Sequence, residues 1–264
     1  MKKLLAMVLT LTLIMTFAAG CGGQKADNSL ENVMKAGKLV MLTNAGFPPF
    51  EYVEGTEPVG VDVDVAQAIA DELGVTLQVV DMDFEGLINA LVSGKGDIVA
   101  AGMSITEDRL KSVDFTVEYV TSAQYMIVKE GSPIATLEDL KGKAIGVQTG
   151  TTGDFIISDE IDLAEGVLNG TGAEIKHYKT ALEAALDLNT GRLDAVVIDK
   201  HPATAIAEKN PGLTVAEKAI SDEESYAIAV KKGGTALKTK IDEVLKKLIS
   251  EGKIDEFLVK HTAG

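Results

Sequence analysis

The feature that most constrains the fold is a regular alternation of short apolar runs with amphipathic segments early in the chain. Apolar runs at 39–42, 75–80 and 97–101 are typical of buried strands. Between them, 64–73 and 87–92 carry apolar residues at helical spacing, and Asp64 is expected to cap the first helix, which Gly74 ends. This strand-helix-strand-helix-strand order predicts an α/β layer with a mostly parallel sheet.

The rest of the chain has a similar order. Strands are predicted at 143–147, 175–178, 194–198 and 226–230, and helices at 154–160, around 182–186, at 236–251 and near 254–261. Segments 87–101 and 182–198 both consist of a helix, a glycine-containing turn and an apolar strand. This likeness suggests two facing α/β lobes, although any two units of this kind share such a pattern.

The N-terminus has the pattern of an export signal. Lys2 and Lys3 precede an apolar run at 4–18, which is short for a membrane span and stops at small residues before Cys21. The alternative, a membrane-anchoring helix, is less favoured because Gly20 ends the run abruptly. No second apolar run is long enough to cross a bilayer.

Cys21 is the only cysteine, so it cannot form an intramolecular disulfide. The residues before it resemble the lipobox of bacterial lipoproteins, with Ala18 where leucine is usual. The resemblance implies a signal peptide at 1–20 and a tether at 21–29, with a palmitate-type lipid anchor on Cys21. One such anchor would hold a soluble domain at a membrane without spanning it.

Composition excludes several classes of protein. The formal net charge of −15 argues against nucleic acid, which requires a basic face. With 46% hydrophobic and 25% charged residues, the chain can form a proper core and is not expected to be disordered. The three histidines are scattered and give no metal or catalytic spacing, so no metal, cofactor or catalytic residue is expected.

Arg109 follows the strand predicted at 97–101, and ligands bind at such carboxyl ends in α/β sheets. Thr106 is a natural helix N-cap, and Arg109 would then lie in the first turn, where the helix dipole does not favour a cation. Its guanidinium could bind a carboxylate in a bidentate manner. Equally, it could pair at the surface with Glu107 or Asp108.

The ends of two later strands also carry polar groups. Segment 148–153 combines hydroxyls with a helix start and could bind an anion, but it matches neither a P-loop nor a dinucleotide fingerprint. The alternative is an ordinary capped helix. Asp199 ends a buried strand and needs a partner, which could be a ligand ammonium group, or it could cap the helix that contains Pro202.

Phe47 and Phe84 stand on loops where aromatic rings could enclose an aliphatic side chain. The alternative is plain core packing, which is the better interpretation for Phe50.

Several motifs occur together in order along the chain. They are FPPFEY at 47–52, VGVDVD at 59–64, MDF at 82–84, AGMSIT at 101–106 with Arg109, VDFT at 113–116, GTT at 150–152 and the segment 194–199. Together they resemble the polar amino-acid-binding proteins of ABC importers, such as the glutamine, histidine and lysine/arginine/ornithine binders. The resemblance covers nearly all of the chain after Cys21. It implies an α/β fold of the type II periplasmic-binding-protein class, with lobe one at 30–121 plus 224–264, lobe two at 122–223, and two crossover hinge strands.

The resemblance also implies roles for individual residues. Arg109 would bind the ligand α-carboxylate with the backbone N–H groups of Ser104 and Thr152. Asp199, the Gly102 carbonyl and the Ser104 hydroxyl would bind the α-ammonium group. The residues expected to surround the rest of the ligand are Phe47 and Phe84 on its flanks, with Asn44, Ala101, Gln148 and Thr151.

Family members that bind cationic side chains usually carry an acid where this chain has Asn44, so a neutral polar amino acid is favoured over lysine or arginine. The expected partners are this free amino acid, the permease subunits of an ABC transporter, and a membrane reached through lipid on Cys21. We expect a monomer on the extracellular or periplasmic side of the cell membrane, and no enzyme. Two alternatives remain open: a cyclohexadienyl-dehydratase-like enzyme on the same fold, and an amino-acid-sensing domain.

Overall fold

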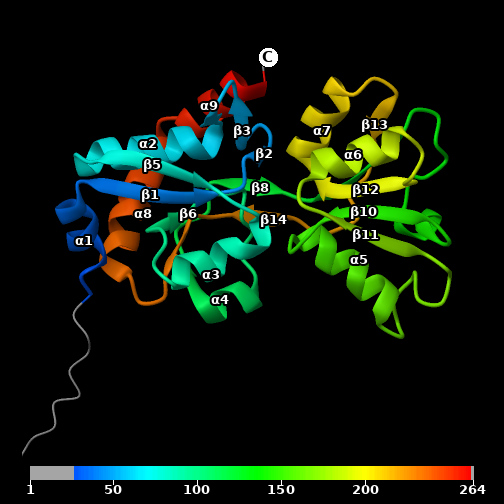
Figure 1. Ribbon diagram of the computed structural model, residues 1–264, viewed down its shortest axis with the longest axis horizontal. Coiled ribbons are helices and arrows are strands. Elements are labelled where there is room, and N and C mark those ends of the chain that lie inside the picture. The colour runs from blue at the N-terminus through cyan, green and yellow to red at the C-terminus, as the bar shows by residue number, and fades with distance from the viewer. Residues whose placement is uncertain (1–26, 263–264) are drawn as a thin grey trace, which may run out of the picture.

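The computed structural model describes residues 27–262, so the predicted signal peptide and Cys21 lie outside the described residues. The described chain forms two α/β lobes side by side, joined in the middle by two extended segments (Figure 1). The expected two-lobed α/β fold is therefore confirmed. Both described ends of the chain belong to the same lobe, here called lobe one (Figure 1).

The sheet of lobe one has the strand order β5-β1-β6-β15-β7. Its strands are β1 (Lys38–Thr43), β5 (Thr76–Asp81), β6 (Ile98–Val99), β7 (Val113–Phe115) and β15 (Ala229–Lys231). β1 pairs in parallel with β5 and β6, whereas β15 pairs antiparallel with both β6 and β7. A strand from far along the chain thus lies inside this sheet.

Helices cover both faces of the lobe-one sheet, with α2 and α9 on one side and α3 and α4 on the other (Figure 1). The helices are α1 (Ser29–Ala36), α2 (Val61–Leu73), α3 (Leu87–Val92) preceded by the 3-10 turn η1 (Phe84–Gly86), α4 (Glu107–Ser112), α8 (Thr235–Ser250) and α9 (Lys253–Thr262). A small separate sheet contains β2 (Gly46–Phe47), β3 (Glu51–Glu54) and β4 (Glu57–Val59).

The sheet of lobe two has the order β11-β10-β12-β9-β13 and is built in the same way. Its elements are the strands β9 (Gln124–Lys129), β10 (Ala144–Gln148), β11 (Glu174–Tyr178), β12 (Ala195–Asp199) and β13 (Leu213–Val215), and the helices η2 (Leu137–Leu140), α5 (Thr152–Asp162), α6 (Ala181–Asn189) and α7 (Lys200–Lys209). β11, β10 and β12 are parallel, and β9 and β13 are antiparallel. The likeness between segments 87–101 and 182–198 reflects this shared order, because β6 and β12 occupy equivalent sheet positions.

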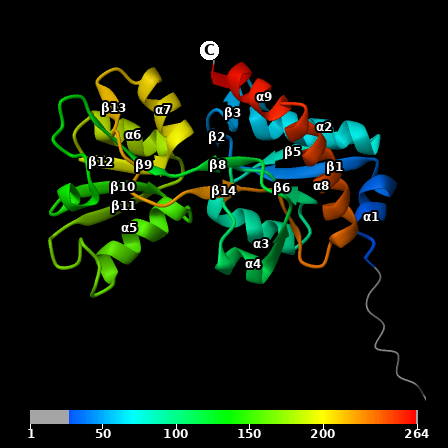
Figure 2. The ribbon, with the colours of Figure 1, turned by 180° about the vertical axis from the view of Figure 1, so that it is seen from behind.

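Two strands connect the lobes. β8 (Val120–Ser122) pairs antiparallel with β14 (Glu224–Tyr226), and the pair crosses from one lobe to the other, as the view from behind also shows (Figure 2). The single strand predicted at 226–230 is therefore wrong. The chain leaves the connecting pair at Tyr226 and joins the lobe-one sheet only at Ala229.

The predicted cap at Asp64 is also wrong, because α2 begins earlier, at Val61, with Gly60 at its N-cap position. Asp64 lies in the first turn and contacts α9 instead. Its Oδ2 accepts a hydrogen bond from Lys260 Nζ (2.7 Å) and lies 2.9 Å from His261 Nε2. The predicted end of α2 at Gly74 is confirmed by its left-handed conformation, with φ of 67°.

Candidate functional site

The carboxyl ends of the parallel strands in the two lobes face each other, which is where α/β sheets bind ligands. A small cavity lies there, between the lobes. It is lined by Phe47, Phe84, Gly102, Ser104, Arg109, Thr151, Thr152 and Asp199. All eight belong to the set named from the sequence, and five come from lobe one while three come from lobe two.

Arg109 is buried on α4, and its contacts extend to both lobes. Its Nη1 donates to the Ser104 carbonyl (2.7 Å), and its Nη2 donates to the Gly150 carbonyl of lobe two (3.1 Å). The guanidinium carbon lies 5.5 Å from the centre of the Phe84 ring. Burial lowers the pKa of Arg109, and the negative charges of Glu224 and Asp199 oppose that shift. The group is thus held as a buried cation at the cavity.

The Arg109 guanidinium lies inside the molecule rather than in a surface ion pair with Glu107 or Asp108. Thr106 caps α4 as predicted, because its Oγ1 accepts from the Arg109 backbone N–H (3.2 Å). Asp108 pairs with Lys111 at the surface rather than with Arg109. The guanidinium therefore points into the space between the lobes instead of forming a surface ion pair.

Asp199 ends β12 and is buried, and its side chain makes no capping hydrogen bond to α7. The Tyr226 hydroxyl donates to its Oδ1 (2.5 Å). Burial, followed by the charge of Glu224, raises the pKa of Asp199 to about 7, against the lowering effect of hydrogen bonds from Tyr226 and Gln124. Asp199 thus faces the cavity as a carboxyl group whose pKa lies near neutral pH.

Gln124, Glu224 and Tyr226 were missed by the sequence reasoning. Gln124 Nε2 donates to Thr152 Oγ1 (3.0 Å) and to Glu224 Oε1 (2.5 Å). These two bonds tie β14, which runs between the lobes, to the lining of the cavity. These residues lie in or beside β8 and β14, and none of them follows the carboxyl end of a strand that the sequence predicts. Only the pairing of those two strands brings them to the site.

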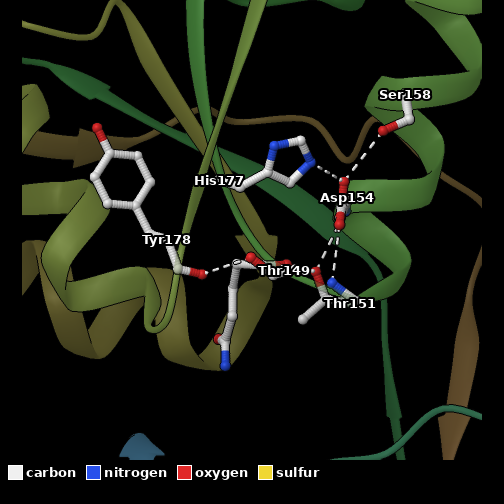
Figure 3. A network of polar contacts seen from close by, with 8 residues as sticks. Thr149, Thr151, Asp154, Ser158, His177 and Tyr178 are labelled. Carbon is white, nitrogen blue, oxygen red and sulfur yellow. Dashed lines mark hydrogen bonds and ion pairs between the residues drawn. The ribbon is translucent and has the colours of Figure 1, made fainter. Parts of the chain in front are cut away.

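Segment 148–153 runs from the end of β10 to the start of α5, and a polar network supports it (Figure 3). Thr151 is the N-cap residue, and its Oγ1 donates to the Gln148 carbonyl (2.8 Å). Asp154 Oδ2 accepts from the Gly150 N–H (2.8 Å), while its Oδ1 lies 2.9 Å from His177 Nε2. The network fixes the loop from behind, so its hydroxyls and helix start stay at the cavity.

The three remaining predicted residues lie beside the cavity but not on its lining. Asn44 Nδ2 donates to the Met82 carbonyl (2.9 Å), and its Oδ1 accepts from Gln148 Nε2 across the lobes (2.9 Å). The oxygen of the same Gln148 amide, Oε1, is buried and has no hydrogen-bond partner in the described part of the chain. Ala101 is buried in the apolar cluster behind the strand ends.

Within residues 27–262, no three histidine, cysteine, aspartate or glutamate side chains are grouped to hold a metal ion. Over the same residues, no helix has the length and apolar character needed to cross a bilayer.

Comparison with known proteins identifies the family. The model of the bacterial extracellular solute-binding proteins, family 3, matches residues 39–263. The chain belongs to this family. It is 33% identical over 267 residues to the arginine-binding extracellular protein ArtP of Bacillus subtilis (strain 168), covering 100% of this chain and 99% of that protein.

Solved structures give the same assignment for this family-3 protein. A mutant of ArgBP from T. maritima superposes with a TM-score of 0.81 at 38% identity, covering 89% of this chain and 100% of that one. An ancestral arginine-binding protein bound to glutamine gives a TM-score of 0.77 at 41% identity, covering 85% and 97%. These likenesses support the type II binding-protein fold expected from the sequence motifs.

Proposed function

We propose that this protein binds a free polar amino acid between its lobes and delivers it to the permease of an ABC-type transporter. The observation that carries the proposal is the opposition of charges at one cavity. Arg109 of lobe one and Asp199 of lobe two both line it. A zwitterionic ligand matches this pair of charges, and it would draw the two lobes together by binding both.

The ligand backbone would be held as follows. Arg109, with the backbone N–H groups of Ser104 and Thr152, binds the α-carboxylate. Asp199 binds the α-ammonium group, with the Gly102 carbonyl and the Ser104 hydroxyl. All of these residues line the cavity, which supports the assignment.

Phe47 and Phe84 flank the ligand side chain. We propose that the side chain carries N–H groups, because the buried Gln148 Oε1 is an acceptor without a donor among the described residues. The sequence expectation of a neutral ligand rests on Asn44, but Glu224 adds an acid beside the site. Arginine and glutamine, which the names of the compared proteins mention, are therefore the two ligands to test first.

The compared proteins are named as binding proteins, which supports binding over the dehydratase-like alternative. We propose that β8 and β14 form the hinge for closure, with lobe one at 30–121 plus 224–264 and lobe two at 122–223.

We further propose that the protein acts as a monomeric lipoprotein, with a signal peptide at 1–20 removed and lipid on Cys21. The lone cysteine behind a short apolar run supports this. Replacing Cys21→Ser should move the protein from the membrane fraction to the soluble fraction of expressing cells. Retention in the membrane fraction by that variant would contradict the lipid anchor.

Replacing Arg109→Ala tests the binding proposal. It should lower affinity for arginine or glutamine by about 10²-fold or more, since loss of one partner of a buried charge pair costs roughly 3–5 kcal/mol. Isothermal titration calorimetry measures the affinity, and circular dichroism checks the fold. Arg192→Ala is the matched control, because Arg192 is exposed and pairs with Asp187. Equal affinities for wild type and Arg109→Ala would refute the carboxylate role.

A further inference from the structure

Two carboxyl groups meet in the core of lobe one, behind the cavity. Glu51 is the first residue of β3, and Asp62 is the second residue of α2. Both are fully buried, with 0% of each residue exposed. Backbone bonds fix their proximity, because the Asp62 N–H donates to the Phe50 carbonyl (2.9 Å), which directly precedes Glu51. The helix start is thus tied to the strand start.

Asp62 uses both of its oxygens to hold other parts of the lobe. Oδ2 accepts from the Gly102 backbone N–H (2.8 Å), and Oδ1 accepts from the Tyr119 hydroxyl (2.7 Å). Gly102 lines the ligand cavity, and the Tyr119 N–H donates to the Tyr226 carbonyl of β14 (3.0 Å). Asp62 therefore connects the cavity loop to the strands between the lobes.

Glu51 is in a different situation. Neither of its oxygens accepts a hydrogen bond from any donor in residues 27–262. The charged groups that act on it are all acids, namely Asp62, Asp199 and Asp81, while Tyr119 faces Asp62 and the His201 ring packs on Phe50. Two adjacent buried carboxylates without a cation cannot both stay ionised.

Burial, reinforced by the charge of Asp62, raises the pKa of Glu51 well above its ordinary value of 4.5. Burial also raises the pKa of Asp62, to about 6, while hydrogen bonds from the Gly102 N–H and the Tyr119 hydroxyl lower it. Asp62 accepts two hydrogen bonds, which favour its charged form, whereas Glu51 accepts none, so the proton belongs on Glu51 and the negative charge on Asp62.

We propose that Glu51 is a proton-bearing positioning residue, whose carboxyl group donates a hydrogen bond to Asp62 and so holds the Gly102 backbone at the ligand cavity. The positioning role rests on the proposed amino-acid binding. The proton on Glu51 does not, so the two parts are tested separately.

The proton is tested on ligand-free protein by urea unfolding at pH 5, 6, 7 and 8. Because the folded pKa is raised, stability from the protonated group is present at low pH and is lost as pH rises. The unfolding equilibrium constant of wild type should thus rise relative to Glu51→Gln, by up to about tenfold per pH unit. Glu54→Gln, exposed on the same strand, should run parallel to wild type. Parallel curves for wild type and Glu51→Gln would overturn the proton assignment.

The positioning role is tested with two variants at Glu51. Glu51→Gln keeps a donor for Asp62 and should bind arginine or glutamine within about threefold of wild type, whereas Glu51→Leu removes the donor and should bind at least tenfold more weakly. Glu51→Leu that binds as tightly as Glu51→Gln overturns the role.

A readout that does not need the ligand is hydrogen exchange of the Gly102 amide, measured by NMR at pH 6. It should be faster in Glu51→Leu than in Glu51→Gln, and equal rates overturn the role. Should Glu51→Leu fail to fold, Glu51→Met takes its place in both measurements, because its side chain is close to glutamine in size but has no hydrogen-bond donor. If wild type binds no amino acid, the proposed function fails. The unfolding and hydrogen-exchange measurements still test the proton on Glu51 and its effect on Gly102, because neither needs a ligand.

Discussion

At the scale of single residues, the site depends on where its acids hold their protons. Burial and Glu224 raise the pKa of Asp199 to about 7, so the group is partly protonated at neutral pH. A carboxyl group must be ionised to pair with an ammonium group. Ligand binding is therefore expected to expel a proton from Asp199 below pH 7.

Because binding releases a proton from Asp199, ligand affinity is expected to depend on pH. Affinity for the amino acid should rise from pH 5.5 to about 7, by up to about tenfold per pH unit, and level off above pH 7. Calorimetry in two buffers of different ionisation heat measures both the affinity and the released proton. A flat profile with no proton release would contradict the role given to Asp199.

A second prediction concerns Glu224. Glu224→Gln removes a charge that raises the pKa of Asp199, so the rise in affinity should move to lower pH. The same variant should weaken the binding of arginine more than the binding of glutamine, because it removes a negative charge beside the site. Glu223→Gln, an exposed neighbour, serves as the control. An unchanged pH profile would mean that Glu224 does not act on Asp199.

At the scale of elements, close backbone contact positions the helix that carries Asp62. Gly60 has φ of 137°, and a Cβ there would lie 2.1 Å from the Phe50 carbonyl oxygen. Only glycine fits both the conformation and the space.

Gly60→Ala is therefore expected to lower the free energy of unfolding by about 3 kcal/mol or more, since backbone strain and overpacking each cost roughly 1–3 kcal/mol. Gly233→Ala is the control, with φ of 79° but nothing within 4 Å of its Cβ, and should cost about 1 kcal/mol. Urea unfolding compares the two. Equal losses would show that the contact with Phe50 is unimportant.

Some of the helices and strands could be predicted from the sequence and others could not. Apolar periodicity predicted β1, α2, β10 and β12, because each buries a regular face of the chain. It predicted neither the small β2-β3-β4 sheet nor the short strands β7 and β8, whose residues pack without a clear period. The division between β14 and β15 also follows from long-range pairing, which no local pattern records.

The residues of the site likewise differ in whether the sequence alone could identify them. Residues at the ends of predicted strands, such as Gly102 and Asp199, could be named because strand ends meet at one edge. Gln124 and Glu224 could not, since they reach the cavity only through the pairing of β8 with β14. The partner of Glu51 was equally hidden, because it depends on how α2 packs on β3.

At the scale of the whole molecule, the lobes touch each other across the cavity. Lys179 Nζ of lobe two lies 3.0 Å from Asp83 Oδ2 of lobe one, and Gln148 bonds to Asn44. The backbone of Gly46 also lies close to Thr180 of lobe two, since a Cβ added to Gly46 would lie 3.1 Å from Thr180 Cβ. These contacts describe a closed arrangement.

This contact offers a test of closure. The Gly46→Cys/Thr180→Cys pair, in a Cys21→Ser background, places two Cβ atoms 3.1 Å apart. A small separation of the two segments would bring them to the Cβ spacing of a disulfide, roughly 3.5–4.5 Å. When oxidised, the protein should exchange a bound radiolabelled amino acid at least tenfold more slowly than when reduced. Each single cysteine variant is a control. Equal exchange rates in both redox states would argue against ligand exchange through lobe opening.

The position of β15 has a consequence for how the chain assembles as it leaves the ribosome. β15 lies between β6 and β7, yet more than a hundred residues separate it from β7 in the sequence. All five strands of the lobe-two sheet emerge before β15 does. The sheet of the later lobe in sequence thus has all its strands first, while the sheet of the earlier lobe stays open until its missing interior strand arrives. A chain that is exported while unfinished would leave the β6 and β7 edges exposed for that interval, when a chaperone is most needed.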